Sequence, residues 1–552
     1  MDGISRGDAR TSSARGDVGF FARERTIAGP NFNRWSVPPA ALAIHLCIGM
    51  AYGFSVFWLP MSNEIANAPA SCTNIGLMQA LTTTTCNWSV AQVTYIFGIF
   101  IAMLGVSAAI WGAWLEHAGP RKAGCIAALC WGGGMIVGGI GVMVHQLWLV
   151  YLGAGVLGGI GQGLGYITPV STLIKWFPDR RGMATGFAIM GYGGGAMVGA
   201  PLAVLLMSYY SSDGGTGVAM TLITMGVIYT IVMASGAIGF RVPPNGWHPK
   251  GWQPSQDAKS NAMITKGHVH LNRAWKTKQF WLIWGVLFLN VTAGIAVISM
   301  ASPMLQDVFG GALVGIEDTQ AGLTAAQKAA VVAAAAGLVG LISLFNSIGR
   351  LFWASLSDKI GRKNTYYCFF VIGIVMYSLL PTWGQLGMAG MFVISICIIL
   401  SMYGGGFATV PAYLADIFGT QMVGAIHGRL LTAWTAAGLI GPLIIAALRE
   451  AQLKAGVEPA LVYDRTLYIM AGLLFLGLIC NALVRPVKES DRMSAEEVAH
   501  ERSLQHDDSV SGSAETAARG KFGVGGVLAW LGVGVPFLIG LYIALAKAAA
   551  LF

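Results

Sequence analysis

The sequence predicts an all-α membrane protein made of two pseudo-symmetric six-helix bundles and a thirteenth helix. Of its 552 residues, 55% are hydrophobic and only 11% are charged, whereas a soluble domain carries about 25% charged residues. Thirteen stretches are long and apolar enough to cross a bilayer, which takes about 20 residues per helix. One loop pattern also occurs twice, at equivalent places in the two halves. This composition excludes a soluble enzyme, a disordered chain, a disulfide scaffold and a nucleic-acid-binding domain.

The segments follow one another in a regular order. The expected units are a polar N-terminal tail at 1–37, a six-helix bundle at 38–241, a linker loop at 242–278, a second six-helix bundle at 279–486, a flexible charged segment at 487–521 and an additional helix at 522–549. The expected spans lie at 38–60, 90–114, 122–143, 147–173, 182–207, 217–240, 279–304, 328–354, 364–382, 386–412, 424–448, 464–485 and 522–549. The 75 glycines, about twice the usual share, would let these helices approach one another closely.

Basic residues alternate from one loop to the next. The tail carries six arginines and the segment 241–278 carries seven basic residues, whereas the loops at 61–89 and 144–146 carry none. Because Lys and Arg accumulate on the cytoplasmic side, we expect the N-terminus, the linker loop and the segment 487–521 in the cytoplasm. With thirteen spans, the C-terminus would lie outside. The tail lacks the apolar stretch of a signal peptide, and the expected location is the inner (plasma) membrane.

The repeated loop pattern follows the second span of each half. It combines a small residue, an acidic residue, a glycine and basic residues, at Gly112, Glu116, Gly119, Arg121 and Lys122 and again at Ala354, Asp358, Lys359, Gly361, Arg362 and Lys363. An acidic residue at a helix end close to basic residues predicts an ion-pair network that keeps the cytoplasmic side closed in one state and breaks in the other. The alternative is ordinary cytoplasmic charge.

This duplicated loop in two halves of six spans resembles the major facilitator superfamily over residues 35–486. The resemblance implies that fold and secondary transport by alternating access. Further stretches resemble the oxalate/formate antiporter family, whose members exchange small carboxylates; they are 33–35, 176–186, 191–196, 288–294 and 345–350.

Arg350 is the conspicuous charge deep in a predicted span. It lies eight residues before Asp358, or ~12 Å inside the cytoplasmic end, on a polar face that includes Asn346. An intramembrane arginine is costly, and a guanidinium can bind a carboxylate through two parallel hydrogen bonds. The resemblance implies that the family's carboxylate-binding arginine falls at Arg350. Snorkelling to the interface and pairing with Asp358 alone are the alternatives.

The resemblance also identifies a difference in span eleven. A dicarboxylate-transporting member of the family pairs its arginine with a lysine, and the matching position here is Trp434. Two cations suit a dianion, whereas one cation and an indole suit a monoanion, so a monocarboxylate is favoured over oxalate. Arg429 lies closer to the cytoplasmic end and would not replace that lysine.

The family lines its cavity with aromatic residues. The matching positions here, for which helix packing or an interfacial belt is the alternative, are Tyr166, Tyr192, Tyr403 and Phe407, with Tyr52 as a further candidate. Asn290 and Asn346 are expected to be either interhelical hydrogen-bonding residues or ligand contacts.

Acidic residues are absent away from the ends of the predicted spans. Many proton-coupled transporters relay protons through an intramembrane carboxylate, so this favours exchange or facilitated diffusion. His45 in span one is a possible proton site, with plain packing as the alternative. Cys72 and Cys86 share the 61–89 loop and would form a disulfide if that loop faces an oxidising compartment.

The sequence therefore predicts a transporter of small organic carboxylates, of the monocarboxylate-exchange type. Two alternatives stay open: a proton-linked monocarboxylate symporter, and a carboxylate-binding sensor without net transport. The sensor is disfavoured because the polar segments 241–278 and 486–521 are too short for an output domain. No metal-ligand cluster, nucleophile elbow or phosphate loop occurs in the sequence, so no enzyme activity, metal or cofactor is expected. The expected partners are a small organic anion and the lipid bilayer, and no nucleic acid.

Overall fold

The computed structural model describes residues 19–29, 32–65, 75–211, 215–244, 247–249, 263–316, 323–504 and 523–548. Within these ranges the regular secondary structure is helical, and no strand is present. Thirteen of the helices are long and apolar enough to cross a membrane. The all-α class is therefore confirmed.

The first six spans form the N-terminal bundle. Two of them change helix type along their length. Span one consists of α2 (Val37–Ile48), the 3-10 helix η3 (Gly49–Phe57) and α3 (Trp58–Ser62). Span four consists of α7 (Leu147–Val150), the π-helical segment η5 (Tyr151–Leu157) and α8 (Gly158–Trp176). The continuous spans are α5 (Val90–Ala118), α6 (Pro120–Met143), α9 (Arg181–Tyr210) and α10 (Val218–Gly239).

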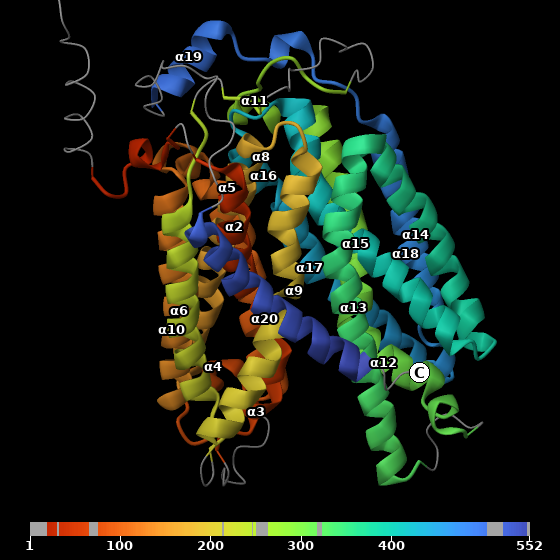
Figure 1. Ribbon diagram of the computed structural model, residues 1–552. Coiled ribbons are helices and arrows are strands. Elements are labelled where there is room, and N and C mark those ends of the chain that lie inside the picture. The colour runs from red at the N-terminus through yellow and green to blue at the C-terminus, as the bar shows by residue number, and fades with distance from the viewer. Residues whose placement is uncertain are drawn as a thin grey trace, which may run out of the picture.

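The next six spans form the C-terminal bundle, which lies beside the N-terminal bundle (Figure 1). Its helices are α12 (Lys278–Phe309), α13 (Ala325–Ile360), α14 (Arg362–Gln385), α15 (Ala389–Phe418), the pair α16 (Val423–Leu430) and α17 (Thr432–Lys454), and α18 (Asp464–Leu483). Two short helices, α11 (Leu271–Ala274) and α19 (Ala495–Leu504), lie at the upper end in Figure 1.

Glycines bring neighbouring helices into backbone contact. Gly49 of η3 lies against Gly195 of α9, where a Cβ added to Gly49 would come within 3.0 Å of the Gly195 Cα. Gly112 of α5 lies against Ala425 of α16, where an added Cβ would be 2.9 Å from the Ala425 Cα. The second contact joins the two bundles, as expected for a small residue at an interhelical crossing.

One end of the molecule carries a group of basic side chains and is called the basic face below; they are Arg34, Arg121, Lys175, Arg181 and Arg362. The charge bias predicts that this face is cytoplasmic. Arg449, which that bias leaves on the opposite face, donates a hydrogen bond to Asp307 at 2.8 Å and another to the Tyr463 hydroxyl at the same distance. Pairing with Asp307 offsets the charge of this arginine.

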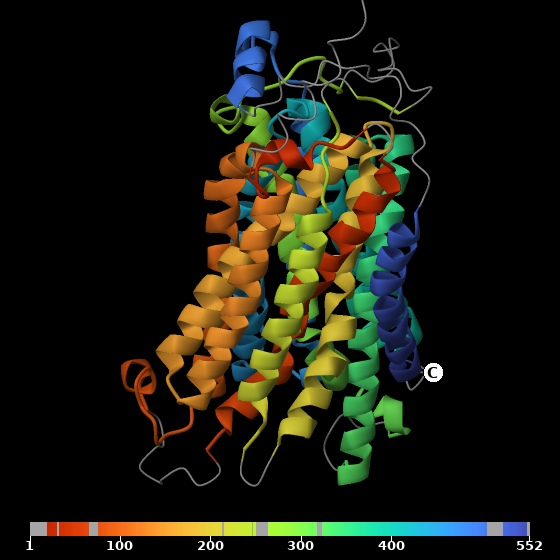
Figure 2. The ribbon, with the colours of Figure 1, turned by 60° about the vertical axis from the view of Figure 1, so that its left-hand side comes forward.

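The thirteenth span is α20 (Val524–Ala548), which lies on the outside of the bundles (Figure 2). It contacts α2, α9 and α13. Cys72 lies outside the described residues, so the disulfide between Cys72 and Cys86 stays a prediction. Residues 1–18 of the expected tail and 505–521 of the expected flexible segment also lie outside them.

Candidate functional site

Arg350 lies between the two bundles, where α13 faces α9. Its side chain is completely buried. Its Nε donates a hydrogen bond to Oδ1 of Asn346, one turn earlier, at 3.1 Å. Its Nη1 donates to the carbonyl oxygen of Ile189 at 3.2 Å, across the gap between the bundles. The remaining terminal nitrogen, Nη2, has no hydrogen-bond partner.

The guanidinium is also without a carboxylate partner among the described residues. Asp358, the partner that the sequence left open, instead accepts hydrogen bonds from the start of α9 and from Arg362. Arginine keeps its charge at any accessible pH, and placing it in a membrane costs about 2.5–3.5 kcal/mol on insertion scales. A bound anion would supply the missing negative charge.

Five aromatic side chains, each at most 1% exposed, form a connected cluster around Arg350; we call it the aromatic cage, and it consists of Tyr166, Tyr192, Tyr403, Phe407 and Trp434. The guanidinium carbon lies 5.4 Å from the Tyr192 ring centroid and 5.5 Å from that of Phe407, within cation–π range. The Trp434 ring is 5.5 Å from Tyr166 and from Tyr192 and 5.0 Å from Phe407. Helices of both bundles therefore build the cage.

Three polar atoms of this cluster have no partner. They are Nη2 of Arg350, the hydroxyl of Tyr166 and Nε1 of Trp434. Buried polar groups in proteins are nearly always hydrogen-bonded, so these three donors are available to a bound water molecule or a ligand. Tyr52 adjoins the cluster, because its hydroxyl is 3.1 Å from the Tyr403 hydroxyl and its ring is 5.1 Å from Tyr192.

The structure thus brings together every substrate-binding candidate that the sequence predicts, with Asn346 holding the Arg350 side chain. His45 lies beside the cage: its Nε2 is 3.3 Å from the Tyr166 carbonyl oxygen, and its Nδ1 is unpaired. This position leaves both packing and a proton role open.

Sequence reasoning missed two buried polar residues next to the cage. Gln162 donates a hydrogen bond to the Tyr192 hydroxyl at 2.7 Å. Its position four residues before Tyr166, on the same face of α8, is a signal that could have identified it. His427 has two unpaired ring nitrogens and lies 5.9 Å from the Tyr166 ring. The break between α16 and α17 separates His427 from Trp434, and the sequence did not predict this break.

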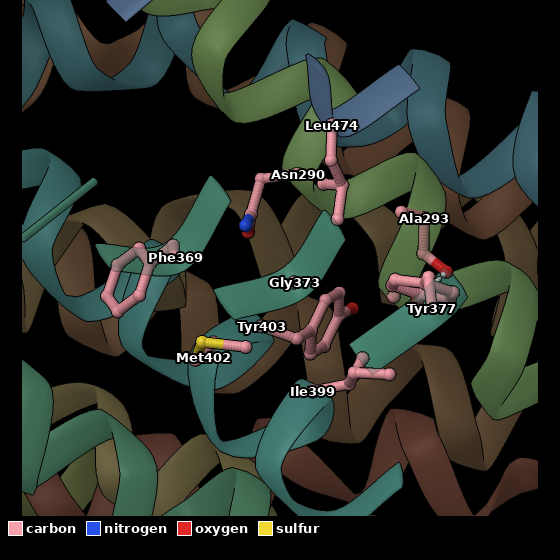
Figure 3. Close-up of a pocket in the computed structure, with 10 residues that line it drawn as sticks. Asn290, Ala293, Phe369, Gly373, Tyr377, Ile399, Met402, Tyr403 and Leu474 are labelled. Atoms are coloured by element: carbon pink, nitrogen blue, oxygen red, sulfur yellow. Dashed lines mark hydrogen bonds between the residues drawn. The ribbon is translucent and has the colours of Figure 1, made fainter. Parts of the chain in front are cut away.

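A small cavity that Tyr403 helps to line lies inside the C-terminal bundle (Figure 3). Its volume is about 10 Å³, enough for one water molecule and too small for a carboxylate substrate. Arg350 does not line it. The residues that do are Asn290, Ala293, Gly294, Phe369, Gly373, Tyr377, Ile399, Met402, Tyr403 and Leu474.

On the basic face, Asp358 of the repeated motif reaches the N-terminal bundle. Its carboxylate accepts hydrogen bonds from the backbone N–H groups of Gly182 and Met183, both at 2.9 Å, at the first turn of α9. Arg362 also donates to it, at 2.6 Å. A carboxylate at a helix N-terminus is stabilised by the unpaired N–H groups and by the helix dipole.

Glu116 makes the equivalent contact from the other half. Its carboxylate accepts from the backbone N–H of Gly424, at the start of α16, at 3.0 Å and from Lys175 at 2.7 Å. The helices that carry the two acids both end at a glycine with positive φ, Gly119 at 81° and Gly361 at 87°. The repeated sequence pattern therefore forms a repeated structure, and we call the Asp358 and Glu116 contacts together the two-acid lock.

The other charged motif residues contact their surroundings differently. Arg121 donates to the Phe20 carbonyl oxygen at 2.9 Å, and the Lys122 ammonium lies 5.9 Å from the Trp114 ring centroid. Lys363 donates to the Ala482 carbonyl oxygen at 2.9 Å, while Lys359 is exposed. None of these contacts crosses between the bundles.

One inter-bundle ion pair was missed from the sequence. Arg181 at the start of α9 donates to Asp416 of α15 at 3.0 Å, and Arg362 donates to the same carboxylate at 3.3 Å. No contact for Asp416 was predicted from the sequence. Nothing in the chain order indicates that Arg181 faces it.

The sequence model of the protein family named Major Facilitator Superfamily matches residues 41–442, well over half of the chain. The chain belongs to the major facilitator superfamily. It is therefore a multi-pass membrane protein and a secondary transporter. Two solved structures share the fold of this superfamily member. The E. coli fucose:proton symporter has a TM-score of 0.55 at 13% identity, covering 82% of this chain and all of that protein. The proton:xylose symporter has a TM-score of 0.54 at 13% identity, covering 85% and 98%.

Curated relatives of this superfamily member include transporters with carboxylates in their names. The oxalate:formate antiporter of Oxalobacter formigenes is 29% identical over 394 residues, which cover 70% of this chain and 82% of that protein. Apicoplast pyruvate carrier 1 of Toxoplasma gondii is 24% identical, covering 55% and 60%. Monocarboxylate transporter 12 of Rattus norvegicus is 23% identical, covering 58% and 65%.

We expect Asp358→Asn to open the basic face of this transporter more often. Neutralising a carboxylate at a helix N-terminus removes up to ~2 kcal/mol, so we expect about tenfold faster opening. The reporter is a cysteine at Thr185, a buried residue whose hydroxyl donates to the Ala408 carbonyl across the bundles. The measurement is its labelling rate by a membrane-permeant maleimide, corrected for the protein without the reporter.

The control is Glu489→Gln, which removes an exposed carboxylate that is paired only with Arg492 at 3.4 Å. If Asp358→Asn labels at the rate of this control, the two-acid lock does not hold the basic face closed.

Proposed function

We propose that this protein exchanges small monocarboxylates across the membrane by alternating access, with Arg350 as the anion-binding residue. The observation that carries the proposal is the buried guanidinium, which has an unpaired N–H group and no carboxylate partner among the described residues. The relatives named for oxalate, formate, pyruvate and monocarboxylates support the substrate class.

The number of cations in the site supports a monoanion. The resemblance implies that Trp434 is at the position where a dicarboxylate-transporting member of the family has its second cation. Arg429 does not replace that cation, because it donates to the Leu271 carbonyl oxygen and to Asn272 Oδ1, both at 3.2 Å, near the basic face. A single carboxylate would bind Arg350, with the Trp434 N–H and the Tyr166 hydroxyl as additional donors.

The proposed transport cycle uses the contacts between the bundles. Arg350 and its cage are inaccessible, and the two-acid lock is formed on the basic face. We assign the basic face to the cytoplasm, because it carries the Lys and Arg clusters. Release of the carboxylate to the cytoplasm would then require both acids of the lock to leave their helix N-termini.

Replacing Arg350 by Gln is expected to lower carboxylate counterflow about 100-fold. Two charge-assisted hydrogen bonds of about 1.5 kcal/mol each would be lost. The measurement is uptake of labelled formate and pyruvate into liposomes loaded with the same unlabelled acid. Lys454→Gln is the matched control, because it removes a cation that is 75% exposed and far from the cage in its ion pair with Glu450. If Arg350→Gln exchanges these anions like the control, the proposed site is wrong.

Replacing Trp434 by Lys is expected to move the preference toward oxalate. The new ammonium would supply a second cation at the cage, so the ratio of oxalate to formate exchange should rise by about tenfold or more. Trp434→Phe is the control, because it removes the N–H without adding charge. Oxalate exchange in the unmodified protein as fast as that of any monocarboxylate would contradict the inference from Trp434.

A proton-linked symport is the second candidate, because two buried histidines flank Tyr166. The ring centroids of His45 and His427 lie 5.4 Å and 5.9 Å from that of Tyr166, and both rings have unpaired nitrogens. Under the exchange proposal, a pH gradient drives no accumulation in liposomes that lack internal carboxylate. Accumulation that is driven by the gradient and lost in His45→Gln or His427→Gln would instead establish symport.

A further inference from the structure

The thirteenth span lies across the line where the two bundles meet. In Figure 1, α20 runs obliquely over α9 of the N-terminal bundle and α13 of the C-terminal bundle. It packs against both helices and also against α2. We call the contact between α9 and α13 the seam. The two sides of the seam move relative to each other when the bundles of such a transporter rock.

At its first turns, α20 is attached to the N-terminal bundle. The Trp530 indole donates a hydrogen bond to the carbonyl oxygen of Trp35, just before α2, at 3.2 Å. The Trp530 ring also packs edge-on against Phe187 of α9, with ring centroids 6.2 Å apart. Both contacts lie on the N-terminal side of the seam.

In its middle, α20 contacts the turn of α9 that carries Tyr192 of the candidate site. Phe537 packs against Gly194 so closely that a Cβ there would lie 2.5 Å from the ring. The neighbouring residue Gly193 points about 100° further round α9, toward α13, where an added Cβ would lie 2.8 Å from Ser347 Oγ and 3.1 Å from Arg350 Nε. One turn of α9 is therefore held between Phe537 outside and Arg350 inside, and the same turn carries Tyr192 of the cage.

Toward its end, α20 also reaches the C-terminal bundle. Gly540 still contacts the N-terminal bundle: it lies against the Met197 carbonyl of α9, where an added Cβ would be 3.0 Å from the oxygen. Ala544, which is buried, packs against Gly340 of α13, where an added Cβ would be 3.4 Å from the Ala544 carbonyl oxygen. The opposite side of α20 is exposed and apolar, for example at Leu538. That side is suited to contact with lipid, so α20 packs against both bundles through its other face.

We propose that α20 is an intramolecular clamp that stabilises the occluded arrangement, and that Phe537 is a positioning residue for the Tyr192 turn of α9. A helix bound to both sides of the seam loses contacts when the sides separate, so it shifts the equilibrium toward the state in which all its contacts are made. Phe537 touches no cage side chain and acts through the α9 backbone. The clamp does not depend on which substrate is carried.

The test compares Phe537→Ala with Leu538→Ala, its exposed neighbour on the same helix. The first readout is maleimide labelling of a cysteine at Thr185, which needs no substrate. We expect Phe537→Ala to label about tenfold faster than the unmodified protein and Leu538→Ala to label at the unmodified rate. Equal rates for all three proteins, or equal acceleration in both variants, would overturn the clamp.

A double-mutant cycle keeps the test decisive if Phe537→Ala folds poorly. Gly194→Ala places a methyl group where the Phe537 ring lies, so it should speed labelling in the unmodified protein but have little further effect when combined with Phe537→Ala. Additive effects would show that Gly194 and Phe537 act independently and would overturn the proposal. Phe537→Leu, which retains an apolar contact, should restore most of the slow labelling.

The transport readout tests the positioning role separately. In counterflow of formate, a displaced Tyr192 turn should raise KM at least as much as it lowers the maximal rate, whereas loss of clamping alone should change the rate. An unchanged KM in Phe537→Ala would overturn the positioning role of Phe537. The labelling experiment alone would then decide whether α20 is a clamp. If the protein moves no carboxylate at all, the proposed function fails, but the labelling result still decides the clamp.

Discussion

The site depends on one constraint: Arg350 is fully buried between the two bundles and is paired with no acidic side chain of the described residues. A charge in this position needs either a counter-ion or water to stabilise it. The cage also lowers the local dielectric constant, which strengthens the attraction between the guanidinium and any anion that enters. Because helices of both bundles form the walls, the enclosed site exists only while the bundles are together.

Two helices connect this site to the basic face. α13 carries Arg350 and, eight residues later, Asp358, while α9 begins at the residues that Asp358 binds and carries Tyr192 ten residues after Gly182. At 1.5 Å per residue these separations are ~12 Å and ~15 Å along continuous helices. Continuous helical backbone therefore joins Arg350 and Tyr192 to the Asp358 contact on the basic face. α20 packs on the same two helices. The candidate site, the Asp358 contact and α20 therefore all lie at the seam between α9 and α13.

The sequence predicted the spans well and placed Glu116 and Asp358 at equivalent helix ends, because both depend on local patterns, while the gating role of these acids stays a prediction. Span length follows from bilayer thickness, and the glycines that end α5 and α13 repeat in the sequence together with Glu116 and Asp358. The cage was reached through family resemblance. Gln162, His427 and the pairing of Arg181 with Asp416 were not found, because they depend on which helix faces meet. Helices that are apolar on nearly every side do not specify their facing side by periodicity.

The single positive charge in the cage, that of Arg350, favours a substrate with a single negative charge. With one carboxylate bound, the guanidinium and the anion would sum to zero, and the Trp434 N–H and Tyr166 hydroxyl could each donate without adding charge. A dianion would leave one negative charge uncompensated in a site lined by aromatic rings, where an unpaired buried charge costs several kcal/mol. The relative named for oxalate shows that this fold can serve a dianion. Under the proposed function, Arg350 is the cation that binds the substrate and the ring walls of the cage are neutral, so the net charge of the occupied site would favour a monoanion.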